Sequence, residues 1–240
     1  MPSSRYQRVV LKLSGETLSG EGKRGIDFKK VAGLCDELRP ALESGIGLIM
    51  VLGGGNLFRG RDAAGLELDR VAADRMGMLA TVLNASALGA ALVSQGFSVR
   101  VFSATPMSPM AEPYRVEDAR EALKRGELVL TSGGIGSPFF STDTTAALRA
   151  LELNADVLLK GTKVDAVYDR DPKLDSEATR YDTLSYNEAL AKDLKVMDAT
   201  AMALCRDGGL SLRVFDFTKP GNLDRILSGE PLGTLVTKEA

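Results

Sequence analysis

The chain has 240 residues, 44% of them hydrophobic, and its 30 basic and 32 acidic residues give a formal net charge of −2. This balance, without a long basic run, argues against binding to nucleic acids or to anionic membranes. The complete absence of histidine excludes histidine-based acid–base relays, phosphohistidine chemistry and histidine metal ligands, so any catalysis must use lysine, arginine, aspartate or the backbone.

The first part of the chain predicts a strand, a helix and a second strand. Residues 8–13 form a short apolar strand that contains a single lysine near its end. Asp27 can cap a helix with apolar residues at helical spacing that ends near residue 45, although Pro40 should kink or shorten it. Residues 47–52 are a nearly unbroken apolar strand, typical of burial on both faces of a parallel sheet.

Helices and strands continue to alternate through the middle of the chain. A long helix rich in alanine, methionine and leucine is expected from about 68 to 92, and its small side chains favour close packing and a subunit interface. Residues 104–112 contain two prolines and are predicted to form a loop. The other elements expected here are strands at 98–102, 127–130 and 156–159, and helices at 116–124 and from about 142.

A long polar stretch follows residue 160, and loops of that length are often functional. The last elements expected are helices at 185–192 and 198–206 and strands at 212–215 and 234–237, separated by a short helix. Because the chain shows no linker-like break, internal repeat or low-complexity segment, we expect a single α/β domain over residues 1–240.

Cysteine usage and hydropathy bear on the compartment. Cys35 and Cys205 lie in apolar helical patterns without C-x-x-C spacing, which predicts buried thiols in a reducing compartment. No stretch approaches the length of an apolar membrane span, and the N-terminus lacks the profile of a signal peptide. We therefore expect a cytoplasmic protein.

Four expected strands run directly into glycine-rich or lysine-bearing turns. The turns are KLSG at 12–15, GGGN at 53–56, SGGIG at 132–136 and KGTK at 160–163. In a parallel sheet all four turns would open on one edge. Backbone N–H groups in glycine turns and at helix N-termini bind anions, and lysines can neutralise phosphate charge. The edge is therefore predicted to bind a polyphosphate.

Two common nucleotide-binding motifs are absent from the sequence. It contains no G-x-x-x-x-G-K-[ST], and no G-x-G-x-x-G that opens a helix with an acidic residue about twenty positions later. The residues instead fit phosphoryl transfer from a nucleotide to a second nucleotide or to a small acid, which mainly needs positioning and charge neutralisation. Lys12 and Lys160 are candidates for clamping the transferred phosphoryl group, while N–H groups of Gly15, Gly54 and Gly55 hold neighbouring oxygens.

Six motifs together resemble the bacterial uridylate kinases, which have the amino-acid kinase fold. They are KLSGE at 12–16, GGGNLFRG at 53–60, DRMGMLAT at 74–81, PFFSTD at 138–143, KGTKVD at 160–165 and KVMD at 195–198. The resemblance covers essentially the whole chain. It implies a three-layer αβα sandwich around a mainly parallel sheet, transfer of the γ-phosphate of Mg·ATP to UMP in pyrimidine nucleotide synthesis, and a homohexamer.

The resemblance also implies site residues, with UMP held mainly by the N-terminal part of the domain and ATP mainly by the C-terminal part. The implied catalytic residues are Lys12, Lys160, Asp143 and Asp198. The implied ATP site contains Lys12, Leu13, Ser14, Gly15, Gly55, Arg59, Thr162, Tyr168 and Asp171. The implied UMP site contains Gly54, Asp74, Ile135, Gly136, Ser137, Pro138, Phe139, Phe140, Ser141 and Thr142. Magnesium would be held mainly by nucleotide phosphates and water, without a protein ligand.

One position departs from the resembling group, which usually has a small polar residue where this chain has Ile135; a backbone N–H or a water would then replace one contact to UMP. The group is often activated by GTP and inhibited by UTP, but no effector-binding set is matched here. Two alternatives stay open: a small-acid or carbamate kinase of the same fold, and a nucleotide sensor without catalysis.

Overall fold

The computed structural model describes residues 6–60, 68–172, 174–175 and 177–239. The prediction that the N-terminus lacks a signal-peptide profile concerns residues 1–5 as well, which lie outside this range. The strands are β1 (Arg8–Leu13), β2 (Gly47–Leu52), β3 (Val99–Ser103), β4 (Glu112–Pro113), β5 (Leu128–Ser132), β6 (Val157–Thr162), β7 (Val167–Tyr168), β8 (Arg180–Tyr181), β9 (Thr183–Ser185), β10 (Ser211–Asp216) and β11 (Thr234–Thr237). The helices are the 3₁₀ helix η1 (Gly15–Leu18) and α1 (Phe28–Glu43), α2 (Arg70–Ser94), α3 (Val116–Lys124), α4 (Thr142–Glu152), α5 (Tyr186–Ala191), α6 (Ala199–Asp207) and α7 (Asn222–Leu227).

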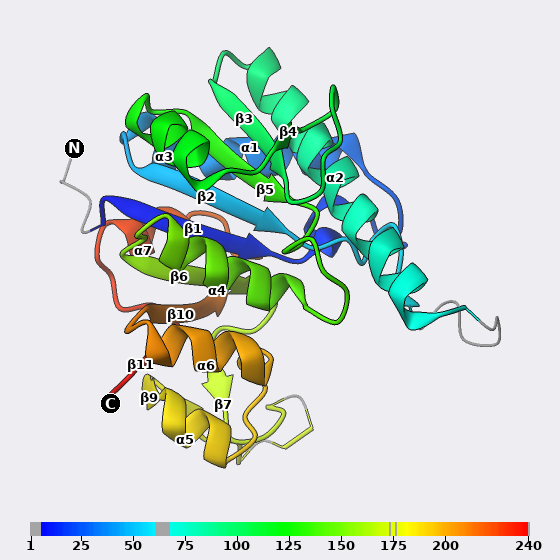
Figure 1. The fold of residues 1–240 in the computed structure, drawn as a ribbon. Helices are drawn as coiled ribbons and strands as arrows, with labels where there is room; N and C mark the ends of the chain where they lie inside the picture. The colour runs from blue at the N-terminus through cyan, green and yellow to red at the C-terminus, as the bar shows by residue number, and fades with distance from the viewer. Residues whose placement is uncertain (1–5, 61–67, 173, 176, 240) are drawn as a thin grey trace.

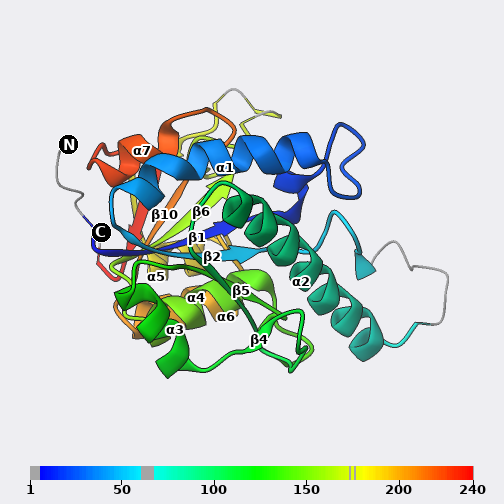
Figure 2. The ribbon, with the colours of Figure 1, turned by 90° about the horizontal axis from the view of Figure 1, so that it is seen from above.

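Nine of the strands form one sheet in the order β4-β3-β5-β2-β1-β6-β10-β11-β9, and β7 pairs with β8 separately. Every neighbouring pair in the large sheet is parallel except β10 and β11, which are antiparallel. Helices cover both faces of the sheet (Figure 1 and Figure 2). The expected three-layer α/β architecture around a mainly parallel sheet is therefore confirmed.

The two faces of the sheet bury two separate hydrophobic clusters. Val10, Ile49 and Leu158 face α3, α4, α5 and α6, whereas Val9 and Leu48 face α1, α2 and α7. Successive side chains of a strand point to opposite faces, so strands buried on both sides must be apolar at nearly every position. This explains the apolar runs at residues 9–11 in β1, 48–52 in β2 and 157–159 in β6.

Helix α1 begins and ends close to its predicted bounds. The side chain of Asp27 accepts a hydrogen bond from Lys29 N–H, which satisfies one of the unpaired donors of the first turn. Pro40 does not shorten the helix, which continues to Glu43. Because Pro40 is exposed, the carbonyl group that lost its N–H partner lies on the solvent side, where water can replace the bond.

Helix α2 corrects one expectation from the sequence. It is 25 residues long and contains an 18-residue window of mean hydropathy 1.7, so a stretch of membrane-spanning length and composition does occur in the chain. However, 44% of that window is buried, and the helix packs on β3, β5 and α1. Its apolar character is thus accounted for in part by packing on the sheet.

The two cysteines are free thiols and both are buried, as predicted. Burial raises the pKa of the Cys35 thiol and raises that of Cys205 to about 11. Both thiols are therefore protonated at neutral pH and packed as small apolar groups.

Candidate active site

The four predicted turns lie together at one edge of the sheet. Strands β5, β2, β1 and β6 are adjacent and parallel, so the turns that follow them open side by side at their carboxyl ends. Lys12 of β1 is paired in register with Lys160 of β6. Both lysines therefore point to the same face of the sheet, which is the face covered by α4.

Asp143, in the first turn of α4, lies between these two lysines. Its Oδ1 is 2.6 Å from Lys12 Nζ and its Oδ2 is 2.7 Å from Lys160 Nζ. The side chains are 12%, 16% and 14% exposed for Lys12, Lys160 and Asp143, so this group, which we call the lysine clamp, is shielded from solvent. Lys160 also donates to the Val196 carbonyl at 2.6 Å.

Burial and charge compete within the lysine clamp. Burial alone would raise the pKa of Asp143, but the positive charges of Lys12 and Lys160 outweigh it and hold the pKa below its usual value. For Lys160 burial is the larger effect, and together with repulsion from Lys12 it lowers the pKa despite the attraction of Asp143. The carboxylate is therefore ionised, and it keeps two closely spaced ammonium groups together.

The N-terminus of α4 is held against α6 by Asp198. Ser141 caps α4 by accepting from Asp143 N–H at 3.0 Å and Thr144 N–H at 3.1 Å, and its hydroxyl donates to Asp198. Thr144 Oγ1 donates to Asp198 at 3.0 Å, and Asp198 in turn caps α6 at Ala201 N–H. Asp198 thus fixes the helix that carries Asp143, and its negative charge also acts directly on Lys160, whose pKa it raises against the larger effect of burial.

Two of the glycine turns fit because their residues have no side chain. A Cβ atom on Gly15 would lie 2.4 Å from the Gly53 carbonyl oxygen, and one on Gly54 would lie 2.7 Å from the Gly77 carbonyl oxygen of α2. The β1 and β2 turns therefore touch each other, and α2 lies directly on the β2 turn. Asn56 and Asn84 reinforce this contact through reciprocal amide hydrogen bonds of 3.0 and 2.7 Å.

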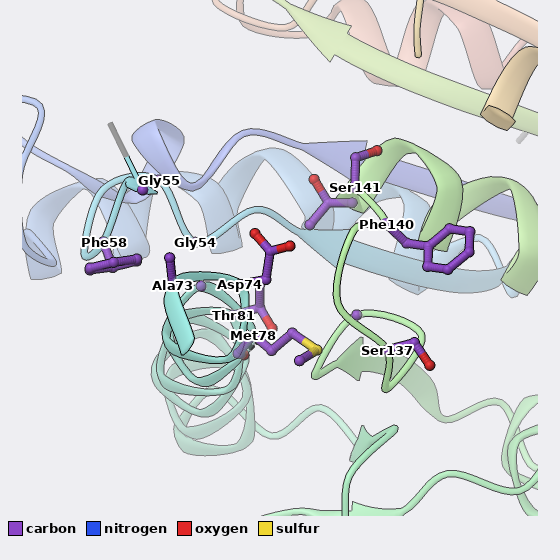
Figure 3. A pocket seen from close by; sticks show the side chains of 14 residues that line it. Gly54, Gly55, Phe58, Ala73, Asp74, Met78, Thr81, Ser137, Phe140 and Ser141 are labelled. Carbon is purple, nitrogen blue, oxygen red and sulfur yellow. Dashed lines mark hydrogen bonds between the residues drawn. The ribbon is translucent and has the colours of Figure 1, made fainter. Parts of the chain in front are cut away.

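A smaller cavity of about 170 Å³ lies between α2 and the segment that precedes α4 (Figure 3). Its lining includes six residues of the implied UMP site, which are Gly54, Asp74, Ser137, Phe140, Ser141 and Thr142. Gly55, from the implied ATP site, lines this cavity too. The implied UMP residues Ile135, Gly136, Pro138 and Phe139 are not in the lining.

Asp74 is held in place by two neighbours. Arg70 Nε lies 2.9 Å from both carboxylate oxygens, and Phe139 N–H donates at 2.7 Å. Burial would raise the pKa of Asp74, but these two partners lower it below its usual value. Phe139 adopts a left-handed backbone conformation with φ of 72°, and the Arg70 guanidinium lies 5.2 Å from the centre of its ring. Phe139 thus orients the carboxylate from outside the cavity.

A larger cavity of about 780 Å³ opens on the other side of the lysine clamp, toward α1. Its lining includes four residues of the implied ATP and catalytic sets, which are Lys12, Lys160, Ser14 and Thr162. Residues of the implied ATP site outside this lining are Leu13, Gly15, Gly55, Arg59, Tyr168 and Asp171. Leu13 is fully buried, so it can offer only its backbone to a ligand.

Sequence reasoning missed several charged residues of the larger cavity. Six of them are Glu16, Lys23, Lys29, Lys30, Glu37 and Lys163, and Glu21 lines the cavity as well. Glu16 and Lys163 lie within two of the motifs quoted above, so their positions gave a signal, but no role was assigned to either. The other five have no distinctive spacing in the sequence.

The chain resembles known proteins over nearly its whole length. Residues 7–216 match the profile of the amino acid kinase family. The chain is 47% identical to the uridylate kinase of Bacteroides thetaiotaomicron, covering 97% of this chain and 99% of that protein, and 50% identical to that of Zymomonas mobilis, covering 98% and 97%. Among solved structures, a UMP kinase from Bacillus anthracis superposes with a TM-score of 0.95 at 38% identity, covering 98% and 97% of the two chains. The uridylate kinase of Archaeoglobus fulgidus gives 0.73 at 29% identity, covering 95% and 99%.

Proposed function

The chain belongs to the amino acid kinase family, and we propose that its lysine clamp transfers the γ-phosphate of ATP to UMP between the two cavities. The protein is a uridylate kinase, a nucleoside monophosphate kinase that forms UDP and ADP. The observation that carries the proposal is the position of Asp143 between Lys12 and Lys160, at the edge where four strands end. Two fixed ammonium groups at that point can neutralise the negative charge on the phosphoryl group while it is transferred.

The clamp fits a reaction that needs no general base. The attacking oxygen belongs to the phosphate of UMP, which is already ionised at neutral pH, so no hydroxyl proton has to be removed. Lys12 and Lys160 hold the equatorial oxygens of the transferred group, and Asp143 keeps both ammonium groups in position. This account is consistent with a chain that contains no histidine.

We assign the smaller cavity to UMP. Asp74 would accept hydrogen bonds from the ribose hydroxyls, and the segment from Ile135 to Thr142 would surround the phosphate and the base. Ser141 and Thr142 line this cavity and lie next to Asp143 in the sequence, which would bring the acceptor phosphate close to the clamp. Ile135 is half-buried and lies outside the lining, so it does not offer a side chain to the acceptor there.

We assign the larger cavity to the phosphates of ATP. Lys12, Ser14 and Thr162 line it, and Gly15 and Arg59 lie at the neighbouring turns. The adenosine would extend toward Tyr168 and Asp171. These residues lie in the polar stretch after residue 160, in β7 and in the segment between β7 and β8. In this arrangement the acceptor cavity is lined by residues between 54 and 142, whereas the donor cavity is lined by residues 12–37 and 160–220, so the C-terminal part serves only the donor side.

Magnesium is proposed to arrive with ATP, held mainly by phosphate oxygens and water. Within the described ranges, no group of three or more acidic or cysteine side chains is placed to cage a metal. Asp143 lies between the two lysines of the proposed transfer point, and carboxylate oxygens suit contact with water bound to the ion. When bound, Mg²⁺ would neutralise part of the charge on the transferred phosphate.

We also propose that the chain self-associates through α2, as the implied homohexamer requires. Met76, Leu79, Leu83 and Val93 recur at helical spacing on one side of α2 and are between 43% and 59% exposed. An apolar stripe of this length is typical of an interface in an oligomer.

We further propose regulation by GTP or UTP and a cytoplasmic location. The two free, buried thiols support the cytoplasmic location.

Acceptor screening tests the proposed function. Purified protein is mixed with Mg·ATP and, separately, with each nucleoside monophosphate, acetylglutamate, aspartate or carbamate, and ADP formation is measured. We expect strong turnover with UMP alone. Turnover with an acid and none with UMP would leave the donor site in place and overturn the acceptor assignment.

A further inference from the structure

Glu16 has no part in the transfer described above, yet its carboxylate joins three turns of the catalytic edge. It lies in η1, directly after β1. One carboxylate oxygen pairs with Arg59, from the segment after β2, and the other lies 2.7 Å from Lys163 Nζ, just after β6. Arg59 is fixed further by its Nε, which donates to the Gly55 carbonyl at 2.6 Å. A single carboxylate thus holds two cations that come from different parts of the chain.

A carboxylate at this place is unfavourable for a polyphosphate by its charge alone. Glu16 and Lys163 line the larger cavity together with Lys12 and Ser14. The hydrogen bond from Lys163 lowers the pKa of Glu16, so the side chain is ionised at neutral pH and repels phosphate oxygens. Glu16 favours ATP binding overall if fixing Arg59 and Lys163 contributes more to the affinity than its own repulsion of phosphate removes.

Arg59 and Lys163 are side chains whose affinity for a ligand increases when they are ordered before the ligand binds. Both are long side chains with many rotamers, and they are 24% and 55% exposed. A side chain of this kind loses conformational entropy when it is fixed on a ligand, and that loss reduces affinity. Because Glu16 already holds both heads near the turn backbones, less entropy remains to be lost when a nucleotide binds.

We propose that Glu16 is a positioning residue of the donor site, which orients Arg59 and Lys163 toward the phosphates of ATP. This role rests on the proposed function, because it assumes that the larger cavity receives those phosphates. Glu16 acts on the nucleotide through its two cationic partners and does not itself bind it. Its loss should therefore weaken ATP binding while leaving the lysine clamp intact.

Steady-state kinetics of Glu16→Gln test this role, with Glu21→Gln as the matched control. Glu21 lines the same cavity, and within the described chain no ion pair joins it to a cation, so both variants remove one negative charge from one cavity. We expect Glu16→Gln to raise the KM for ATP about tenfold, with kcat and the KM for UMP changed less than about threefold. Glu21→Gln removes only a repulsive charge from the cavity and releases no cation, so it should not raise the KM for ATP.

A second background separates positioning from a general structural effect. In a variant that carries Arg59→Met and Lys163→Met, Glu16 has lost both partners and only its repulsion of phosphate remains. Adding Glu16→Gln to that background should lower the KM for ATP, so the sign of the effect reverses. A further rise of the same size would overturn the positioning role.

The outcomes also separate this role from the proposed function. Wild-type protein is assayed first with Mg·ATP and UMP, and no ADP formation there would refute both the function and the role that rests on it. Normal wild-type turnover with an unchanged KM for ATP in Glu16→Gln, or with a loss confined to kcat, would refute the role of Glu16 alone.

Discussion

The two cavities of the catalytic edge are built from different side chains. Of the described residues that line the smaller one, Asp74 is the only one with a charged side chain, and the others are mostly glycines and short or hydroxyl-bearing residues. The larger cavity is lined by six lysines, at positions 12, 23, 29, 30, 160 and 163. The difference indicates that the acceptor is recognised by shape and hydrogen bonds, and the donor by charge.

The lysine clamp lies between these two regions and depends on rigid elements. Lys12 and Lys160 are fixed by the register of two central strands, and Asp143 by the capped first turn of α4. Sites on strands and helix termini are held more firmly than sites on loops. Changes in the clamp should therefore affect the chemical step, whereas changes in either cavity should affect the binding of one substrate.

The largest effect is expected at the clamp, from Asp143→Asn. The amide keeps the shape of the carboxylate but leaves Lys12 and Lys160 close together without a negative partner. We expect kcat to fall by about 10²- to 10³-fold at saturating ATP and UMP. Thermal unfolding followed by circular dichroism serves as the control for folding. A folded variant with a kcat close to the wild-type value would show that the clamp does not support transfer.

A smaller effect, confined to one substrate, is expected at Asp74. In Asp74→Asn the charge that holds Arg70 is lost and the acceptor capacity toward a ribose is reduced. We expect the KM for UMP to rise by about 10- to 30-fold while the KM for ATP stays unchanged. Equal increases in both constants would contradict the assignment of the two cavities to different substrates.

The smallest effect is expected at Tyr168, which lies beyond the lining of the larger cavity. Its hydroxyl donates to Asp165 at 3.0 Å, and Tyr168 is the last residue of β7, where it pairs with Arg180 of β8. If adenine stacks on it, Tyr168→Ala should raise the KM for ATP about fivefold. That change corresponds to the lower end of the free energy of stacking between a base and an aromatic side chain. An unchanged KM for ATP would place the adenine elsewhere, and the KM for UMP serves as the internal reference.

Much of the fold could be predicted from the sequence, because its strongest signals are local. Val9 to Leu11 and Leu48 to Val51 are apolar at every position since both faces of their strands are covered, and the turns that follow are marked by glycine or lysine. Alternating strands and helices imply a parallel sheet, and a parallel sheet brings such turns to one edge. Lys12 and Lys160 could therefore be placed together without coordinates.

The missed contacts depend on where loops lie in space. Glu16 is 43 residues from Arg59 and 147 residues from Lys163, and no periodic pattern links residues at such separations. The Asn56 and Asn84 pair is similar, because its value comes from the close approach of a turn to α2. The apolar length of α2 was also overlooked, and the structure shows that part of its apolar surface packs on the sheet while Leu79, Leu83 and Val93 are exposed.

The central claim is that Lys12 serves the chemical step. The most direct measurement is the kcat of Lys12→Ala with saturating Mg·ATP and UMP, together with calorimetric titration of the same variant with UMP. The account predicts that kcat falls by about 10²- to 10³-fold, while the affinity for UMP stays within about twofold of the wild-type value. Near-normal turnover in the folded variant would contradict it.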